Sequence, residues 1–316
     1  MPSTSEASAT RPEQIRTSTI KLYRNLDDNP LWAQIIIYLL LAFSGIITLY
    51  PMVNVLAKSF SEAQAIIAHP MMFVPYDFTI EAYKYIFSTS ILIRSFGITV
   101  FVTVVGTFLN LVLTASAAYG LSKTYVPGYK FFIWVVIIPM LIGAGLIPQY
   151  MLLKNLGMLN TLWVLIIPGL ISPFNFILMR NFFWSIPQEL EESAFIDGAS
   201  HLRVLWNIVL PLSKAVLATI GLFYAVGHWN DYFNGLFFIS DNSKWPLQVV
   251  MRSIIIDQNM LNMGSASDAM SMEKTVVTAE NIKAATIIFA IVPILLVYPF
   301  LQKYFVKGIL LGSVKG

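Results

Sequence analysis

The sequence of 316 residues contains no cysteine, and only 12% of its residues are charged. Without cysteine, disulfides and metal sites held by thiolates are excluded. The three histidines, His69, His201 and His228, are far apart and form no HExxH pattern, so a zinc site of that type is excluded as well. Soluble domains carry roughly 25% charged residues, and the shortage of charge therefore indicates a protein embedded in a membrane.

A phosphate-binding loop is also missing. The stretch nearest to the GxxxxGK[ST] pattern, residues 120–124, lacks the first glycine and the required length. The formal net charge of +3 is small, so it does not indicate nucleic acid as a partner. We expect a chain that is not an enzyme, with no catalytic residues, no metal site and no cofactor of its own.

Long apolar runs fill most of the chain, which has 57% hydrophobic residues and a mean hydropathy of +0.70. A bilayer core of ~30 Å is crossed by ~20 helical residues. Because backbone groups in lipid must be hydrogen-bonded within their own segment, we predict that each run is a helix. The predicted fold class is therefore all-α, a polytopic membrane protein with six transmembrane helices at residues 31–56, 95–121, 131–153, 162–182, 212–238 and 284–304.

Basic residues predict the orientation of these spans. Arg11, Arg16, Lys21 and Arg24 lie before the first span, and further basic residues cluster at span ends on the same side. Since Lys and Arg favour the cytoplasmic side, and the number of spans is even, we predict both termini inside, N-in and C-in. This gives a cytoplasmic tail at residues 1–30 and a transmembrane domain at 31–316, with a cytoplasmic loop at 183–211 and outer loops at 57–94 and 239–283.

A polar stripe runs along the second predicted span. Its spacings of four, four, three and four residues keep the side chains on one helical face. Such a face can line a wet pathway, or it can join helices through hydrogen bonds between them. We favour helix packing for the threonines and leave both roles open for the asparagine; the stripe consists of Thr99, Thr103, Thr107, Asn110 and Thr114.

The fifth predicted span ends on Trp229, Asn230, Asp231 and Tyr232. Polar and ionisable groups in a span are costly and therefore suggest a function. Aromatic faces, amides and carboxylates together suit the CH groups and hydroxyls of a sugar. However, Asp231 would lie about 30 Å along the helix from Leu212, near the outer interface, where Trp and Tyr are common in any case. Both a substrate-pathway role and an interfacial role remain open.

The segment 187–211 is a charged island between apolar runs, with acidic residues at 189, 191, 192 and 197. Pro187 suits the first turn of a helix, and negative charge is favoured near a helix N-terminus. Asp197 and Gly198 signal a turn, Ser200 can cap a second helix, and Pro211 marks the entry into the fifth span. We predict two short helices that either dock a partner or form a solvated hairpin.

The residue pattern of this segment resembles the EAA loop of ABC importer membrane subunits. Glu192-Ser193-Ala194 is followed by Gly198 and then by the sequence Ile-Val-Leu-Pro at 208–211. The serine stands where the family has alanine. Other similar stretches are the sequence AYGLSK at 118–123, Trp229-Asn230-Asp231, and the segment 304–312. Together they resemble the carbohydrate-uptake permeases, such as the smaller membrane subunit of the maltose importer, and most of all permeases for alginate- or pectin-type oligosaccharides.

The resemblance implies a multi-pass permease subunit of the cytoplasmic (inner) membrane that translocates oligosaccharides. The implied partners are a second, homologous permease subunit, two ATP-binding subunits that hold ATP and magnesium, an extracytoplasmic sugar-binding protein and membrane lipid. The residues implied to couple this chain to the ATPase are Glu191, Glu192, Ser193, Ala194, Asp197, Gly198, Ala199, Leu210 and Pro211.

Three alternatives remain beside this interpretation. An ABC permease for another solute, such as peptides, would share the same loop. A secondary transporter would show inverted repeats and acidic residues near the bilayer midplane, and the sequence shows neither. A membrane subunit without translocation would need no polar pathway. The sequence does not specify which sugar is carried.

Overall fold

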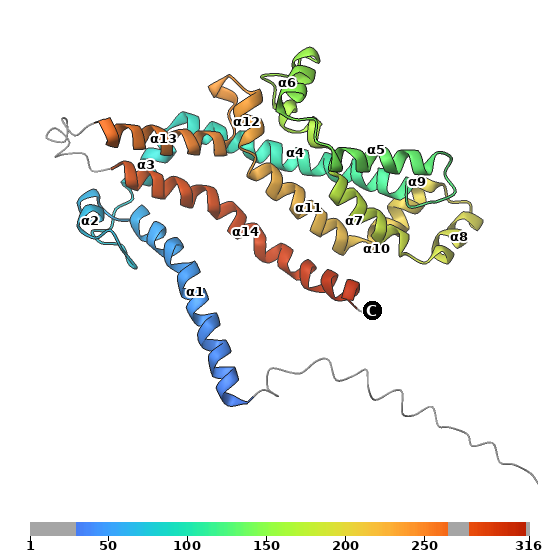
Figure 1. The fold of residues 1–316 in the computed structure, drawn as a ribbon, viewed down its shortest axis with the longest axis horizontal. Coiled ribbons are helices and arrows are strands. Elements are labelled where there is room, and N and C mark those ends of the chain that lie inside the picture. Colours follow the sequence, from blue (N-terminus) through green and yellow to red (C-terminus); the bar gives the residue numbers. More distant parts are fainter. Residues whose placement is uncertain (1–29, 265–277, 314–316) are drawn as a thin grey trace, which may run out of the picture. The chain divides into compact units, whose positions relative to one another are not determined.

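The computed structural model describes residues 30–264 and 278–313 (Figure 1). The predicted tail at 1–30, apart from its last residue, and part of the predicted outer loop at 239–283 lie outside these ranges. The described residues form helices and only one isolated β-bridge, between Ser61 and Phe78. The all-α prediction is therefore confirmed. The chain divides into two units, residues 1–54 and 55–316.

The first unit contains most of helix α1 (Leu31–Ser59), which has Pro51 inside it. Its residues are almost entirely apolar up to Leu56, as the first predicted span requires. A helix of 29 residues is long enough to cross a bilayer core with some tilt. The first apolar run is therefore one continuous helix.

The second unit is built around α4 (Ser90–Gly120). It packs against α7 (Pro173–Trp184), α11 (Lys214–Trp229) and α13 (Leu247–Gly264), and α11 packs in turn against α14 (Ala279–Ser313), as Figure 1 shows. Helix α13 lies within the predicted outer loop at 239–283. Figure 1 also places α3 (Glu81–Ser88) and α13 at one end of α4, and α8 (Gln188–Ile196) at the other end.

Two threonines of the polar stripe join α4 to neighbouring helices. The hydroxyl of Thr99 accepts from the Leu247 N–H at 2.8 Å, and Thr114 Oγ1 lies 2.7 Å from the Tyr224 hydroxyl on α11. The packing role is confirmed for these two threonines. Thr103 and Thr107 have buried hydroxyls that find no hydrogen-bond partner among the described residues.

Three of the six predicted spans are interrupted. The third consists of α5 (Tyr129–Leu141) and α6 (Leu146–Asn155), and the fourth of short 3-10 turns (Leu162–Leu165, Ile167–Gly169) followed by α7 at 47°. In the fifth, α11 ends at Trp229, before α12 (Phe233–Phe238). Gly145, with φ +78°, and Pro173, at the start of α7, explain two of these breaks.

Among the described residues, three helices are long and apolar enough to cross a membrane by themselves, and two bent pairs bring the number of possible spans to five. One pair is the segment Leu162–Gly169 with α7, and the other is the segment His201–Leu212 with α11. Several apolar helices of membrane-spanning character are therefore present.

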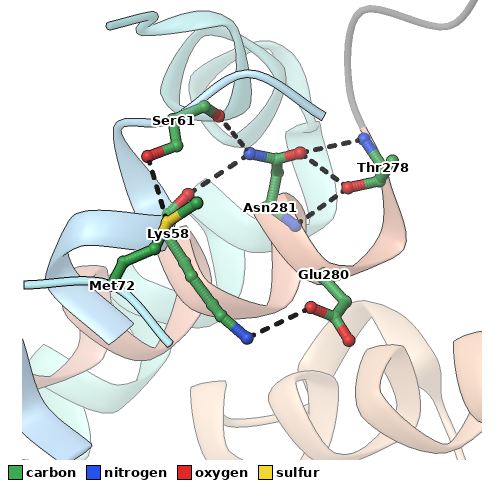
Figure 2. Close-up of polar contacts among 6 residues, drawn as sticks. All are labelled: Lys58, Ser61, Met72, Thr278, Glu280 and Asn281. Atoms are coloured by element: carbon green, nitrogen blue, oxygen red, sulfur yellow. Dashed lines mark hydrogen bonds and ion pairs between the residues drawn. The ribbon is translucent and has the colours of Figure 1, made fainter. Parts of the chain in front are cut away.

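The last turns of α1 are joined to the start of α14 by a polar network (Figure 2). The Asn281 side-chain amide donates to the backbone carbonyls of Ser61 at 2.5 Å and Lys58 at 3.3 Å. Its carbonyl oxygen accepts from the Thr278 hydroxyl at 2.6 Å, and Lys58 pairs with Glu280 at 3.4 Å. These contacts fix the segment between α1 and α2 (Ala63–Ala68) against the last helix.

Gly235 in α12 permits a close approach to the start of α13. A Cβ atom there would lie 2.6 Å from Cγ of Pro246 and 2.8 Å from Cγ2 of Val249. Because the proline ring is rigid, we expect Gly235→Ala to lower the free energy of unfolding by about 1–3 kcal/mol. Thermal unfolding of the purified protein measures this, with Gly97→Ala as control, since that site on α4 has no atom within 4 Å. Equal melting of both variants would contradict this packing.

Candidate coupling hairpin and polar cavity

The segment 187–212, called the α8–α9 hairpin below, forms two short helices as predicted. Helix α8 runs from Gln188 to Ile196, and α9 (His201–Val204) continues through a π-helical turn (Leu205–Val209) into α10 (Leu210–Leu212). Pro187 is the residue before α8 rather than in its first turn. The hydroxyl of Ser200 accepts from the Arg203 N–H at 3.4 Å, so Ser200 caps α9 as predicted.

The turn between α8 and α9 depends on Gly198, whose φ is +80°. The N–H of Ala199 donates to the carbonyl of Ala194 at 2.9 Å and closes the end of α8. No atom lies within 4 Å of the position of a Cβ at Gly198, so a side chain there would project away from the protein. Glycine is required by the backbone conformation and not by lack of space.

Glu191 attaches α8 to the C-terminal end of α4. Its side chain is 5% exposed and pairs with Lys123 Nζ at 2.6 Å. The Tyr119 hydroxyl donates to the other carboxylate oxygen at 3.2 Å. The carboxylate is thus satisfied inside the protein, and Glu191 does not face outward with Glu192.

The opposite side of the hairpin exposes large apolar side chains. Ile196 is 86% exposed, Leu202 70% and Trp206 61%. The inner side contributes Val204 and Val209 to a buried cluster that also contains parts of α4, α7 and α11. The hairpin is therefore packed against the body of the protein on one side and presents an apolar outer face on the other. The exposed residues among the predicted coupling residues are Glu192, Ser193, Asp197, Gly198 and Pro211, and the half-buried ones are Ala194, Ala199 and Leu210.

The chain bends by 86° after the hairpin, between the segment His201–Leu212 and α11. Pro211 lies in the last turn before the bend, and Ser213 in the bend is fully buried. The hairpin is thus continuous with α11, the helix that reaches the other functional candidate, a polar cavity.

This cavity has a volume of about 380 Å³ and lies where the break before α7 meets the C-terminal end of α11. Its volume is within the range of small-molecule pockets, roughly 300–1,000 Å³. Phe223, Tyr224 and Gly227 of α11 form one wall. The polar side chains that line it are Gln149, Ser172, Asn175, His228, Asp231 and Asn234.

Comparison with known proteins identifies the family. Residues 131–311, which include the whole hairpin, match the family described as binding-protein-dependent transport system inner membrane component. The chain belongs to this family. It is a permease subunit of an ABC importer in the inner membrane, and the resemblance seen in the sequence is confirmed. The family is one of transport permeases, and membership implies ATPase and binding-protein partners.

Two relatives from Bacillus subtilis (strain 168) extend over nearly the whole permease. Protein LplC is 47% identical over 272 residues, which cover 86% of this chain and 91% of the relative. The polygalacturonan/rhamnogalacturonan transport system permease protein YtcP is 42% identical over 286 residues, covering 89% and 97%.

A solved structure is similar in fold as well as in sequence. It belongs to a bacterial ABC transporter involved in the import of the acidic polysaccharide alginate. The match has a TM-score of 0.79 and 33% identity, and it covers 86% of this chain and 95% of the other.

Asn110 of the permease supports the cavity and is not among the residues that line it. The residue is fully buried, and its amide donates to the carbonyls of Gly169 at 2.7 Å and Leu170 at 3.0 Å. Its Oδ1 lies 2.8 Å from Nε2 of His228. Asn110 therefore holds the broken segment before α7 against both α4 and α11.

The motif at the end of α11 is divided by the structure. Asp231 lines the cavity, whereas the Trp229 indole is buried, donates to the Ala290 carbonyl at 3.2 Å and packs on Phe96. Asn230 is exposed and donates to the carbonyl of Val226 at 2.9 Å within its own helix. Tyr232 is half-buried with its ring beside Phe233 and is not among the lining residues.

Sequence reasoning missed several residues of both candidate sites. Lys123 and Tyr119 belong to a stretch that resembles the family, but nothing local indicates that they bind Glu191. Asn175 follows the helix-start signal Ser172-Pro173, which indicates its place in the first turn of α7 but not its orientation toward a cavity. These contacts depend on how distant helices pack.

Proposed function

We propose that this chain is the permease subunit of an importer that carries oligosaccharides derived from polysaccharides. The relative YtcP is described as a polygalacturonan/rhamnogalacturonan permease, and the similar structure belongs to an alginate importer. In this proposal the chain crosses the inner membrane six times, with both termini in the cytoplasm. Its partners are a second, homologous permease, two ATP-binding subunits and an extracytoplasmic sugar-binding protein.

The observation that carries the proposal is the two-sided α8–α9 hairpin. Its inner side is fixed by the buried Glu191 and by apolar packing, while Ile196, Leu202 and Trp206 are exposed on its outer side. Three exposed large apolar side chains on one short hairpin favour an interface with another protein. We assign this outer face to the ATPase, with Glu192, Ser193, Asp197 and Gly198 as contact residues.

The geometry suggests how movement of the ATPase reaches the membrane helices. The hairpin is tied to α4 through Lys123 and is continuous with α11 across the 86° bend. A displacement of the hairpin therefore acts on α11, which lines the polar cavity, and on α4, whose Asn110 supports the cavity wall. Alternation between two packings of α4 and α11 would be a hinge-type switch.

Gly198→Asp tests this assignment. A side chain at φ +80° is strained by about 1–2 kcal/mol, and the carboxylate would project from the assigned docking face. We expect normal membrane insertion but at least about tenfold less ATPase in the purified complex, which corresponds to about 1.4 kcal/mol. Uptake of oligosaccharide by cells should fall in parallel.

Gly198→Ala is the matched control, because it introduces the backbone strain without the charge. We expect it to retain most of the ATPase. Normal co-purification and normal uptake in Gly198→Asp would refute the docking role of this turn.

A further inference from the structure

We propose that the polar cavity binds an uncharged sugar unit of the transported oligosaccharide. The inference rests on the proposed function and adds a site within this subunit and the chemistry of its ligand. The cavity lies between α7 and the C-terminal end of α11, next to the break that Asn110 stabilises.

Asn175 supplies an amide that is ready to bind a ligand. Its side chain lines the cavity although the residue is only 5% exposed. Its amide makes no hydrogen bond to another residue in the part of the chain that the structure describes. The amide is reached from the cavity, so a ligand with hydroxyl groups could bond both its donor and its acceptor.

His228 offers a hydrogen-bond acceptor at the same cavity. The Asn110 amide nitrogen already donates to two carbonyls, so the Asn110 oxygen must face Nε2 of His228. Nε2 therefore carries the hydrogen, and in the neutral ring Nδ1 is left as an acceptor. This tautomer suits a hydroxyl donor.

Asp231 determines the charge of the ligand. Its carboxylate accepts from the Asn234 N–H at 3.2 Å and from the Asn234 side-chain amide at 2.9 Å, which fixes its orientation. No lysine or arginine is present among the described residues that line the cavity. With no cation beside it, the carboxylate form of Asp231 repels a sugar carboxylate and accepts from sugar hydroxyls.

The walls fit the flat apolar faces of a sugar. Phe223 and Tyr224 contribute aromatic surface, and the amides of Gln149 and Asn234 contribute polar groups. This mixture of apolar surface and a few polar groups is typical of small-molecule sites. The lining therefore matches a neutral pyranose better than a uronic acid.

Gly227 allows the cavity to be closed without disturbing its surroundings. It lies in α11 on the lining, and no atom is within 4 Å of the position of its Cβ. A leucine there would extend into open space. Gly97 on α4 is equally unhindered and does not line the cavity, so Gly97→Leu is the matched control.

The test uses the whole importer, purified with its ATPase in lipid nanodiscs and without the sugar-binding protein. Saturation-transfer NMR measures contact with a neutral pool of galactotriose, maltotriose and xylotriose, and separately with trigalacturonate. We expect transfer to the neutral pool in wild type and Gly97→Leu, and at least a fivefold loss in Gly227→Leu. Transfer to trigalacturonate should be weak in wild type and should increase several-fold in Asp231→Asn.

Three outcomes would overturn the inference: equal transfer in Gly227→Leu and wild type, no transfer to the neutral pool in wild type, or transfer to trigalacturonate that equals the neutral pool and is insensitive to Asp231→Asn. Co-purification and ATP hydrolysis are measured on the same samples. If the ATPase remains bound and active while one of these outcomes is found, the sugar subsite fails and the proposed coupling function stands.

Discussion

Replacing Lys123 with alanine is expected to lower the free energy of unfolding of the permease by about 3–5 kcal/mol, because the Glu191 carboxylate would remain buried without its cation. The lysine side chain is 14% exposed and the glutamate 5%, so water replaces little of the lost contact. Thermal unfolding in detergent measures the loss. The variant should also couple ATP hydrolysis to uptake less well, since the pair attaches α8 to α4.

Two controls make this result specific to a buried ion pair. Lys84→Ala breaks an exposed pair with Glu81, and it should cost less than about 1 kcal/mol. The double variant Lys123→Met/Glu191→Leu removes both charges and should regain most of the stability. If Lys123→Ala unfolds at the same temperature as Lys84→Ala, the pair does not fix the hairpin.

Replacing Leu202 with aspartate should reduce the ATPase that co-purifies with the permease by at least about tenfold, equivalent to about 1.4 kcal/mol of binding free energy. The leucine is 70% exposed, so the fold should tolerate the change. At a docked apolar face, however, the new carboxylate would be desolvated without a partner. Quantifying both subunits on a gel after affinity purification gives the ratio.

Leu156→Asp is the matched control for this experiment. Leu156 follows α6 and is 62% exposed, but it is far along the chain from the α8–α9 hairpin. Its ATPase content should equal that of wild type, and Leu202→Met should also retain the ATPase. Equal ATPase content in Leu202→Asp and Leu156→Asp would show that the partner binds elsewhere.

The sequence was sufficient to predict the hairpin because its signals are local. The turn at Asp197 and Gly198, the cap at Ser200 and the acidic start of α8 each act within a few residues. Apolar composition likewise predicted the helical class correctly. Hydropathy alone does not locate the breaks at Gly145 and before Pro173, because it measures preference for lipid and not continuity of a helix; the glycine and the proline in these runs are the local signals for them.

The partners of the functional side chains could not be predicted in the same way. Glu191 was among the residues implied to couple the chain to the ATPase, and the sequence did not indicate that its carboxylate pairs with Lys123, which lies 68 positions earlier. Asn110 was a candidate for the pathway, but it supports the cavity wall through carbonyls 59 and 60 positions later. Such pairings depend on how whole helices pack, and a single sequence contains no separate signal for them.

The contact between Asn281 and the carbonyls of Lys58 and Ser61 also bears on biosynthesis. The donor comes from α14 and the acceptors lie 223 and 220 positions earlier. During translation the acceptors are made long before the donor, so this closing contact forms only after nearly the whole chain has left the ribosome. A chain truncated before residue 278 lacks the Asn281 donor and leaves the end of α1 without this attachment. The unattached end of α1 would therefore be a feature by which membrane quality control distinguishes an unfinished permease from a finished one.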